Sequence, residues 1–233
     1  MVKKELTKSE IAESIPDLWQ PLTDTQREYL AQNFTIQKFK KKEIIYCEGE
    51  TPKYLMCLLS GKVKIYKDGA GGRTQIIRVI NNKEYFAYRA YFAEENFVTA
   101  AAAFEPCTIC LIPMSIIVSL IQENAELSMF FIRQLSKDLG IADERTVNLT
   151  QKHMRGRLAE TLIFLEDTYG LEEDHCTLSI YLSREDLANL SNMTTSNAIR
   201  ILSNFAAERI IIVDGKKIKL IDEERLRKIS KIG

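Results

Sequence analysis

The sequence predicts an α+β chain in three parts: an N-terminal region of short strands, a long helix, and a C-terminal region of helices that ends in a β-hairpin. The strands are predicted between Ile36 and Ile112, where short apolar or alternating runs recur roughly every 8–12 residues between turn signals. From Met114 onward the apolar residues take a helical spacing instead. Near the end, Asp214 and Gly215 separate two β-rich runs, which is a strong hairpin signal.

The N-terminal part, residues 1–123, is expected to be a β-roll of the jelly-roll kind, preceded by polar helices. The glycine-rich stretch from Asp68 to Gly72 predicts a hairpin tip, because glycine tolerates the positive φ of such turns. The packed face of the first helices is expected at Trp19, Leu22, Tyr29 and Leu30. The expected strands are Lys42–Tyr46, Tyr54–Leu59, Lys62–Tyr66, Gln75–Ile80 and the run Val98–Ile112.

The middle part, residues 124–150, is predicted to be one long helix that serves dimerisation. Its apolar and small residues follow alternating steps of four and three from Ser128, which is the heptad spacing of a two-helix contact. An ordinary amphipathic helix lying on its own β-roll is the alternative. Phe130 and Phe131 lie beside the heptad positions and would cover the roll. The predicted dimer contacts are Ile132, Leu135, Leu139, Ala142, Thr146 and Leu149.

The C-terminal part, residues 151–233, has the element order of a winged helix-turn-helix. A helix over Lys152–Tyr169 and a strand over Thr177–Tyr181 are predicted first, followed by two helices and the hairpin. Ser183 and Asp186 form a capping pair that can begin a helix. The turn then falls at Ser191-Asn192-Met193, where Asn tolerates a left-handed backbone, and Thr194 caps the second helix.

The outward face of that second helix is predicted to enter the major groove of DNA. Asn197 can read an adenine edge, and Arg200 can pair with guanine or with phosphate. A helical hairpin that merely has a polar face is the alternative. The capping residues, the turn and the following wing occur together, which favours DNA binding. The predicted DNA-binding residues are Ser183, Arg184, Thr194, Thr195, Ser196, Asn197, Arg200, Lys216 and Lys217.

Composition restricts the classes of protein that the chain can belong to. The chain has 233 residues, a formal net charge of zero and five cysteines at irregular spacing, which argues against a disulfide framework. No apolar run approaches the ~20 residues of a membrane span, and the polar N-terminus does not resemble a signal peptide. We therefore expect a cytoplasmic protein. His153 and His175, its two histidines, lie outside the β region, so a metal enzyme on a barrel is not expected and no metal site is predicted.

Three segments carry a family resemblance. The run Leu59-Ser-Gly-Lys-Val-Lys-Ile65 resembles a β-roll element, Asp143-Glu-Arg with Arg155–Leu162 resembles a dimer-helix end and hinge, and Leu182–Asn189 resembles a first helix-turn-helix element. With these segments the chain resembles the Crp/Fnr family of bacterial regulators over nearly its whole length. The resemblance implies a cyclic-nucleotide-binding-like roll, a homodimer, a near-palindromic double-stranded DNA operator, and RNA polymerase as a further partner.

The chain departs from the cyclic-AMP-binding members of that family. Where those show Gly-Glu-Leu followed by Arg-Ser, the similar stretches here are Ala87-Tyr88-Arg89 and Val98-Thr99. A cyclic phosphate would lack its guanidinium partner, which argues against cyclic AMP as the effector. Those members also have a Thr-Ser pair on the dimer helix, and the similar stretch here is Ala142-Asp143. The effector pocket implied by the resemblance therefore consists of Tyr88, Arg89, Val98, Thr99, Ala142 and Asp143.

The cysteines argue against two sensing mechanisms. No cysteine precedes Cys47, so the N-terminal iron–sulfur cluster of the oxygen-sensing branch is not expected. Cys107 and Cys110 have redox-motif spacing but lie in a strand-like run, where residues three apart face opposite sides, and we expect them in the core. The predicted function is a non-enzymatic, sequence-specific DNA-binding regulator with an unidentified effector. A haem- or redox-responsive regulator, and a regulator whose roll is only a scaffold, remain open.

The second helix of the helix-turn-helix also departs from the family's main subgroups. Those typically show Arg-Glu-x-x-x-Arg or Glu-x-x-Ser-Arg, and of the residues Thr195–Arg200 only Arg200 matches. The DNA half-sites known for those subgroups are therefore not expected here.

Overall fold

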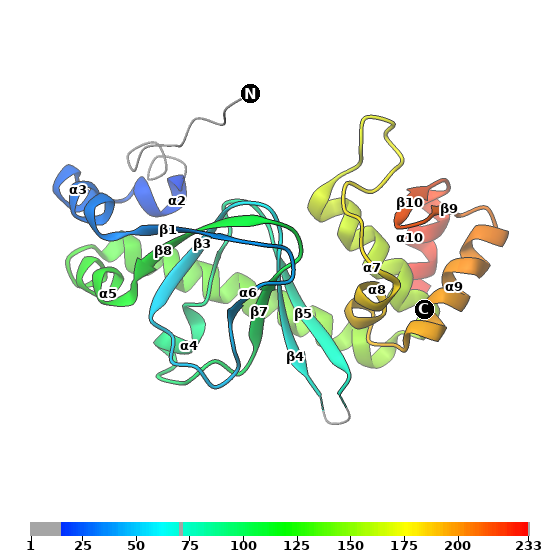
Figure 1. The fold of residues 1–233 in the computed structure, drawn as a ribbon, viewed down its shortest axis with the longest axis horizontal. Coiled ribbons are helices and arrows are strands. Elements are labelled where there is room, and N and C mark those ends of the chain that lie inside the picture. The colour runs from blue at the N-terminus through cyan, green and yellow to red at the C-terminus, as the bar shows by residue number, and fades with distance from the viewer. Residues whose placement is uncertain (1–14, 70–71, 233) are drawn as a thin grey trace. The chain divides into compact units, whose positions relative to one another are not determined.

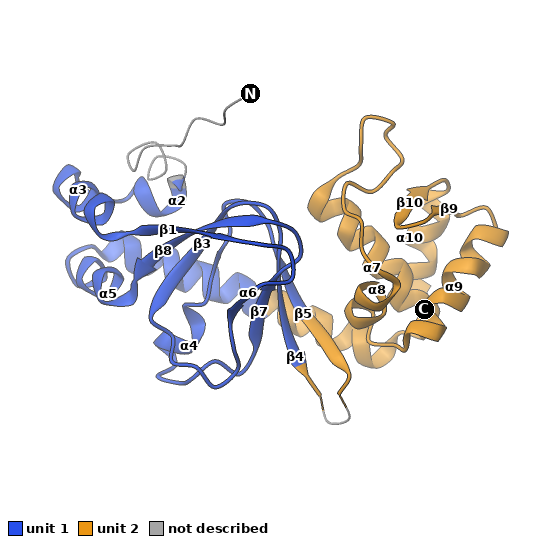
Figure 2. Cartoon of the chain, in the orientation of Figure 1, with its two compact units in different colours: residues 1–67, 77–139 blue, residues 68–76, 140–233 orange. Residues whose placement is uncertain are grey.

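The chain forms two compact units. The computed structural model describes residues 15–69 and 72–232, apart from the side chain of Pro16. Part of the predicted N-terminal helical region falls on residues 1–14 and lies outside the described residues. Contacts group residues 1–67 with 77–139, and residues 68–76 with 140–233 (Figure 2). This division follows contacts, whereas the predicted borders at residues 123 and 150 follow helix ends.

The first unit is built on two four-stranded sheets, ordered β1–β8–β3–β6 and β2–β7–β4–β5 (Figure 1). The strand pairs β1–β8, β3–β8, β3–β6, β2–β7 and β4–β7 are antiparallel. The strands are β1 (Thr35–Phe39), β2 (Ile44–Tyr46), β3 (Tyr54–Ser60), β4 (Val63–Asp68), β5 (Thr74–Ile80), β6 (Tyr85–Phe86), β7 (Ala100–Ala103) and β8 (Cys107–Pro113). The predicted run Val98–Ile112 is therefore two strands.

Among the described residues, five helices accompany these sheets. They are α2 (Pro16–Trp19), α3 (Asp24–Asn33), α4 (Arg89–Phe92), α5 (Met114–Glu123) and α6 (Ala125–Gln151), the last of which continues into the second unit. α3 begins with a capping box, in which Thr23 accepts from the backbone N–H of Gln26. α6 begins after Asn124, whose side chain accepts from the backbone N–H groups of Glu126 and Leu127.

The sheets bury apolar side chains on two sides. One cluster fills the space between the sheets and includes Leu58, Ile65 and Phe86. The other lies on the opposite face of the β8-containing sheet, beneath α2, α3, α5 and α6, and includes Leu18, Leu30 and Phe131. Burial of these two apolar clusters is the main source of the unit's stability. Tyr29, predicted in the packed face, is 42% exposed, so that prediction was wrong.

Cys107 and Cys110 lie in the core, as predicted. Cys107 belongs to the cluster between the sheets and Cys110 to the cluster under the helices, so the two thiols face opposite sides of β8. Burial raises the pKa of Cys107 to about 11 and that of Cys110 to about 12. Both thiols therefore stay protonated at neutral pH, and neither has the thiolate character that redox sensing requires.

Gly61 explains one of the segments that carry the family resemblance. It joins β3 to β4 with a φ of 89°, a left-handed value that L side chains rarely adopt. A Cβ there would also lie 2.4 Å from the carbonyl oxygen of Pro106 and 2.6 Å from Cβ of Cys107. Both backbone conformation and space therefore require glycine at this turn.

The second unit is helical and ends in a hairpin and a last helix. Its elements beyond α6 are α7 (Met154–Tyr169), α8 (Arg184–Leu190), α9 (Thr195–Ala207), β9 (Ile211–Asp214), β10 (Lys217–Leu220) and α10 (Glu223–Ile232). The predicted strand at Thr177–Tyr181 is wrong. Thr177 and Leu178 make isolated bridges to Lys219 and Leu171 instead, and Asp174 accepts from both the backbone N–H and the hydroxyl of Thr177, which ties this segment into a loop.

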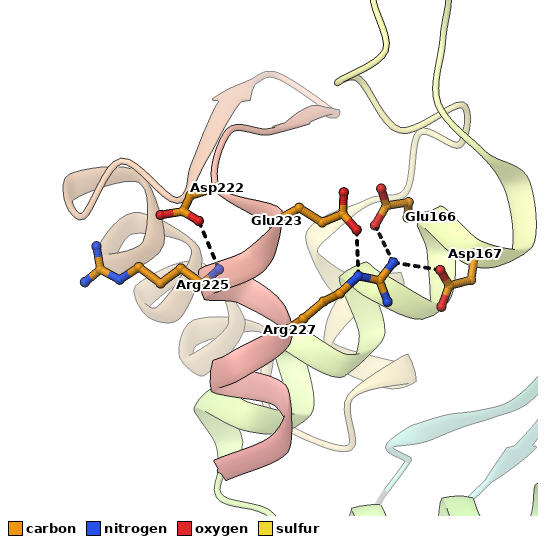
Figure 3. Close-up of polar contacts among 6 residues, drawn as sticks. All are labelled: Glu166, Asp167, Asp222, Glu223, Arg225 and Arg227. Carbon is orange, nitrogen blue, oxygen red and sulfur yellow. Dashed lines mark hydrogen bonds and ion pairs between the residues drawn. The ribbon is translucent and has the colours of Figure 1, made fainter.

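An ion-pair network attaches α10 to α7 (Figure 3). Arg227 on α10 contacts Glu223 at 2.6 Å, Asp167 at 2.9 Å and Glu166 at 3.3 Å. In the same view Asp222 accepts from the backbone N–H of Arg225 and begins the helix. Each exposed pair contributes little alone, but one guanidinium of α10 contacts two carboxylates of α7 and so joins the two helices at this point.

Candidate nucleic-acid interface

The helix-turn-helix is formed by α8, the turn at Ser191–Met193, and α9 (Figure 1). Both helices begin at the predicted caps: Ser183 accepts from the backbone N–H of Asp186 at 3.0 Å, and Thr194 from that of Asn197 at 3.3 Å. Asn192 has a φ of 50°, the left-handed conformation that the turn was predicted to need. The local sequence therefore dictates the local geometry here.

One face of each helix is buried, so the opposite face of α9 is held outward. On α8 the buried residues are Leu187, Ala188 and Leu190, and on α9 they are Ala198, Ile201, Leu202 and Phe205. The side chain of Arg155 also covers Phe205, with its guanidinium carbon 4.7 Å from the ring centre. Burial of this apolar face decides which α9 side chains reach solvent.

The outward face of α9 is polar at its N-terminal end. Thr194, Thr195, Ser196, Ile199 and Arg200 are exposed, and Asn197 is half-buried. The guanidinium of Arg200 donates to the side-chain oxygen of Asn197 at 3.3 Å, and the hydroxyls of Thr194 and Ser196 lie 3.1 Å apart. Donors and acceptors are thus gathered on the first two turns of the helix, where they can meet base edges and phosphate.

The hairpin of β9 and β10 lies beside the start of α8. Arg184 donates to the backbone carbonyl of Gly215 at 2.7 Å, which joins the first helix to the hairpin tip. Because Asp214 pairs with Lys217, the two loop residues are Gly215 and Lys216, one residue later than the predicted Asp-Gly turn. Gly215 has a φ of 56°, as its place in a two-residue loop requires. Lys216 and Lys217 are exposed.

Two acidic residues of this unit, Glu208 and Asp174, pair with basic side chains. Glu208 contacts Arg155 at 2.7 Å and Arg225 at 2.9 Å, and Arg155 holds the pKa of Glu208 below its ordinary value. Hydrogen bonds from Thr177 lower the pKa of Asp174, which also pairs with Lys219 at 3.1 Å. Arg200, Lys216 and Lys217 are exposed cations of this unit, although the chain as a whole has no net charge.

The predicted dimer face of α6 is largely open. Ile132 is 53% exposed and Leu139 63% exposed, while Ala142 and Thr146 are also exposed and Leu135 and Leu149 are half-buried. Phe131, beside this face, is 3% exposed and packs in the core under the helix, as predicted. Apolar side chains at heptad spacing without a covering element are typical of a helix that pairs with another.

The residues of the predicted effector pocket do not share one environment. Tyr88 is 2% exposed and donates from its hydroxyl to Asp138 at 3.2 Å, and burial raises its pKa. Arg89 is exposed and pairs with Glu95, and Val98 is 47% exposed. Thr99 is half-buried and hydrogen-bonded to Tyr46. Ala142 and Asp143 lie exposed on the part of α6 that belongs to the second unit.

Sequence reasoning missed two residues near Tyr88. Arg78 on β5 pairs with Asp138 on α6 at 2.6 Å, and both side chains are largely buried. Phe131 and Phe92 pack edge-on against Tyr88, with ring centres 5.6 and 6.3 Å away. A lone arginine in the apolar run Gln75–Ile80 was the available signal, but nothing in the sequence named its partner.

Two negative findings apply to residues 15–69 and 72–232. No group of three or more His, Cys, Asp or Glu side chains there could hold a metal ion. No single helix there has the length and apolar composition of a membrane span; α5 and α6 meet that test only as a pair, bent by 119°.

Comparisons with known proteins agree with this architecture. The family model for the cyclic nucleotide-binding domain matches residues 36–124, and the model for the Crp-like helix-turn-helix domain matches residues 156–229. A CRP-like cAMP-activated global transcriptional regulator of Mycobacterium tuberculosis is 24% identical over 189 residues, covering 81% of this chain and 84% of that protein. The chain belongs to the Crp/Fnr family and is a DNA-binding transcription regulator of that type.

Solved structures show the same fold. FixK2 from Bradyrhizobium japonicum superposes with a TM-score of 0.76 at 21% identity, covering 84% of this chain and 96% of that one. A CRP/FNR-family transcriptional regulator from Thermus thermophilus superposes with a TM-score of 0.71 at 22% identity, covering 84% and 98%. The family consists of transcription regulators, which are typically not enzymes.

Proposed function

We propose that the chain acts as a homodimer and that α9 of each copy reads the major groove of a near-palindromic operator. The observation that carries this proposal is the outward polar face of α9, clamped from behind by Leu202 and Phe205. Two such helices in a dimer would lie about one DNA turn apart, each on one half-site. DNA and RNA polymerase are the expected partners, and the cytoplasm is the expected place of action.

The proposed roles of the residues follow their positions. Thr194, Thr195 and Ser196 lie at the N-terminus of α9, where hydroxyls and backbone N–H groups suit phosphate. Asn197 and Arg200 are one helical turn apart and suit base edges. The proposed backbone contacts are made by Ser183 and Arg184 at the start of α8 and by Lys216 and Lys217 at the wing tip.

The proposed dimer contact is the exposed heptad face of α6. A second copy would cover Ile132 and Leu139, which are otherwise more than half exposed to water. Ala142 and Thr146 would allow close approach of the two helices farther along, and Leu135 and Leu149 would complete the contact. The break after α6, at Lys152 and His153, is the proposed hinge.

We propose that an effector other than cyclic AMP binds in or near the roll and regulates the chain. The relative in Mycobacterium tuberculosis is described as cAMP-activated. Here Tyr88 is buried and bonded to Asp138, and the apolar Val98 stands where the resemblance implies an arginine. A cyclic phosphate would be taken from water without a guanidinium partner, which disfavours its binding.

An effector-independent regulator is the second candidate, favoured by the same region. Tyr88, Phe92 and Phe131 pack on one another, and Arg78 and Asp138 satisfy each other's charge, so this part of the roll is held together by its own side chains. A redox-responsive regulator receives less support because Cys57, Cys107 and Cys110 are buried. A haem-binding regulator would show a Soret band in the purified protein.

Genomic footprinting of the purified protein, with and without cell extract, tests the proposal. Protection of near-palindromic sites by the protein alone would support the effector-independent candidate. Protection that needs the small-molecule fraction of the extract would support the effector-controlled one. Absence of protected sites under both conditions, with the protein folded and dimeric, would contradict the role proposed for α9.

A further inference from the structure

The outward face of α9 carries an apolar side chain among its polar ones. Ile199 is 47% exposed, whereas Ile201 and Leu202 of the same helix are 4% and 2% exposed. Its neighbours on the outward face, one turn before and one turn after it, are the exposed residues Ser196 and Ser203. The roles proposed above belong to polar and charged residues and leave this isoleucine without a function.

Folding of the second unit does not explain an isoleucine at this position. The packing of α9 rests on its buried side, where Leu202 and Phe205 are 2% and 0% exposed. Isoleucine is also a weaker helix former than alanine, because its β-branched side chain loses rotamer freedom in a helix. A nearly half-exposed isoleucine therefore adds little to the stability of α9, and its surface is available to a partner molecule.

The hydroxyl groups beside Ile199 are partly engaged within the helix. Ser203 donates to the backbone carbonyl of Ile199 at 3.0 Å, so its proton points back toward the helix. The hydroxyls of Thr194 and Ser196 lie 3.1 Å apart and share a hydrogen bond, which uses one of their two protons. A base edge opposite Ile199 would therefore be met mainly by hydrocarbon.

The major groove offers hydrocarbon at one kind of base. Guanine, adenine and cytosine present hydrogen-bond donors and acceptors there, whereas thymine presents a 5-methyl group beside its acceptor. A donor or acceptor covered by Ile199 would lose water without gaining a partner, which costs free energy. A methyl group covered by Ile199 would leave water together with part of the isoleucine surface, which is favourable. The side chain at this position therefore favours thymine over the other bases.

We propose that Ile199 packs against the 5-methyl group of a thymine in each half-site and so selects thymine at one position of the operator. This inference rests on the function proposed above, because it needs α9 in the major groove. It differs from the roles of Asn197 and Arg200, which act through hydrogen bonds, since this contact depends on a single methyl group. Deoxyuridine has the hydrogen-bonding groups of thymidine and lacks only that methyl, so it removes this contact alone.

Replacement of thymidine by deoxyuridine, one operator position at a time, tests the proposal. Sites are first selected from random DNA with the purified full chain, and each thymine of the selected half-site is then replaced in both half-sites. At one position the dissociation constant of the natural chain is expected to rise about fourfold per half-site, the factor expected for one buried methyl-sized group, and about 15-fold for the whole operator. Fluorescence anisotropy with labelled operators measures this.

Variants of the isoleucine connect that operator position to its side chain. In Ile199→Ala, deoxyuridine at the sensitive position is expected to change the dissociation constant by no more than about twofold, because the methyl no longer has a surface to cover. Ile199→Val, which keeps a smaller branched side chain, should show an intermediate sensitivity. Ile221→Ala is the matched control, since Ile221 is 50% exposed and follows β10. Its deoxyuridine profile should equal that of the natural chain.

The possible failures of this test are distinguishable. A selected half-site without thymine, a deoxyuridine profile without a sensitive position, or the same sensitive position in Ile199→Ala as in the natural chain would overturn the methyl contact while the function proposed for α9 stands. Absence of any selected site with folded protein would overturn both. All of these substitutions replace exposed side chains and should leave the protein folded, which thermal denaturation checks.

Discussion

The outward face of α9 and the surroundings of Tyr88 in the roll differ in what their polar groups contact. On α9 the polar side chains from Thr194 to Arg200 bond mainly to one another and face solvent. Around Tyr88 the polar groups pair with one another, since Arg78 pairs with Asp138 and the Tyr88 hydroxyl donates to Asp138. The polar groups on α9 are available to a partner molecule, whereas those around Tyr88 are already paired with one another. The specific partner of this chain is therefore better indicated at α9 than in the roll.

The largest expected effect distinguishes the buried side of α9 from its exposed side. Phe205→Ala removes a ring that is fully buried behind the helix, and the free energy of unfolding of the second unit should fall by about 3–5 kcal/mol. Arg200→Ala, on the exposed side of the same helix, should change it by less than about 0.5 kcal/mol. Urea denaturation of both variants measures this. Equal destabilisation would mean that the two faces of α9 are not distinct.

Arg200→Ala should act on DNA binding instead. Loss of a side chain that reads a base edge should weaken specific binding by about 1–3 kcal/mol and leave binding to random DNA nearly unchanged. Lys217→Ala, at the wing tip, should weaken both kinds of binding alike, because a phosphate contact carries no sequence information. Filter binding on both DNAs measures this, and an equal loss on both for Arg200→Ala would refute base reading.

The paired polar groups around Tyr88 in the roll can be separated by removing the ion pair between Arg78 and Asp138. Arg78→Met leaves Asp138 partly buried without its cation, and the free energy of unfolding of the first unit should fall by about 1–2 kcal/mol, less than for a fully buried pair because both side chains retain some exposure. The double variant Arg78→Met with Asp138→Asn should recover part of that loss. A double-mutant cycle from denaturation curves measures the coupling, and additive effects would show that the pair does not stabilise the roll.

The buried thiols give a smaller effect that depends on pH. Since burial raises the pKa of Cys107 to about 11 and of Cys110 to about 12, both bind protons more tightly in the folded state. Their stabilising contribution is complete below the unfolded thiol pKa of about 8.5 and is lost as pH rises toward 11–12. A thiol reagent at pH 8 should modify Cys47 and Cys176 and spare the three buried cysteines. Rapid reaction at all five would contradict their placement.

The local parts of the fold could be predicted from the sequence. The caps Ser183 and Thr194, the left-handed Asn192 and the buried face of α9 are each set by residues within a few positions, and all were confirmed. The pairing of Arg78 with Asp138 joins residues 60 positions apart and leaves no local pattern. The strand predicted at Thr177–Tyr181 failed because alternation alone does not supply a neighbouring strand, and the hydrogen bonds of Asp174 favour a loop.

Selection of binding sites from random DNA, carried out with the natural chain and with Ser196→Glu, tests the claim that α9 reads the operator. The natural chain should enrich a near-palindrome with half-sites about one helical turn apart, and Ser196→Glu should enrich a different half-site of the same spacing. Identical selected sites for both chains, or no enrichment by folded protein, would contradict the claim.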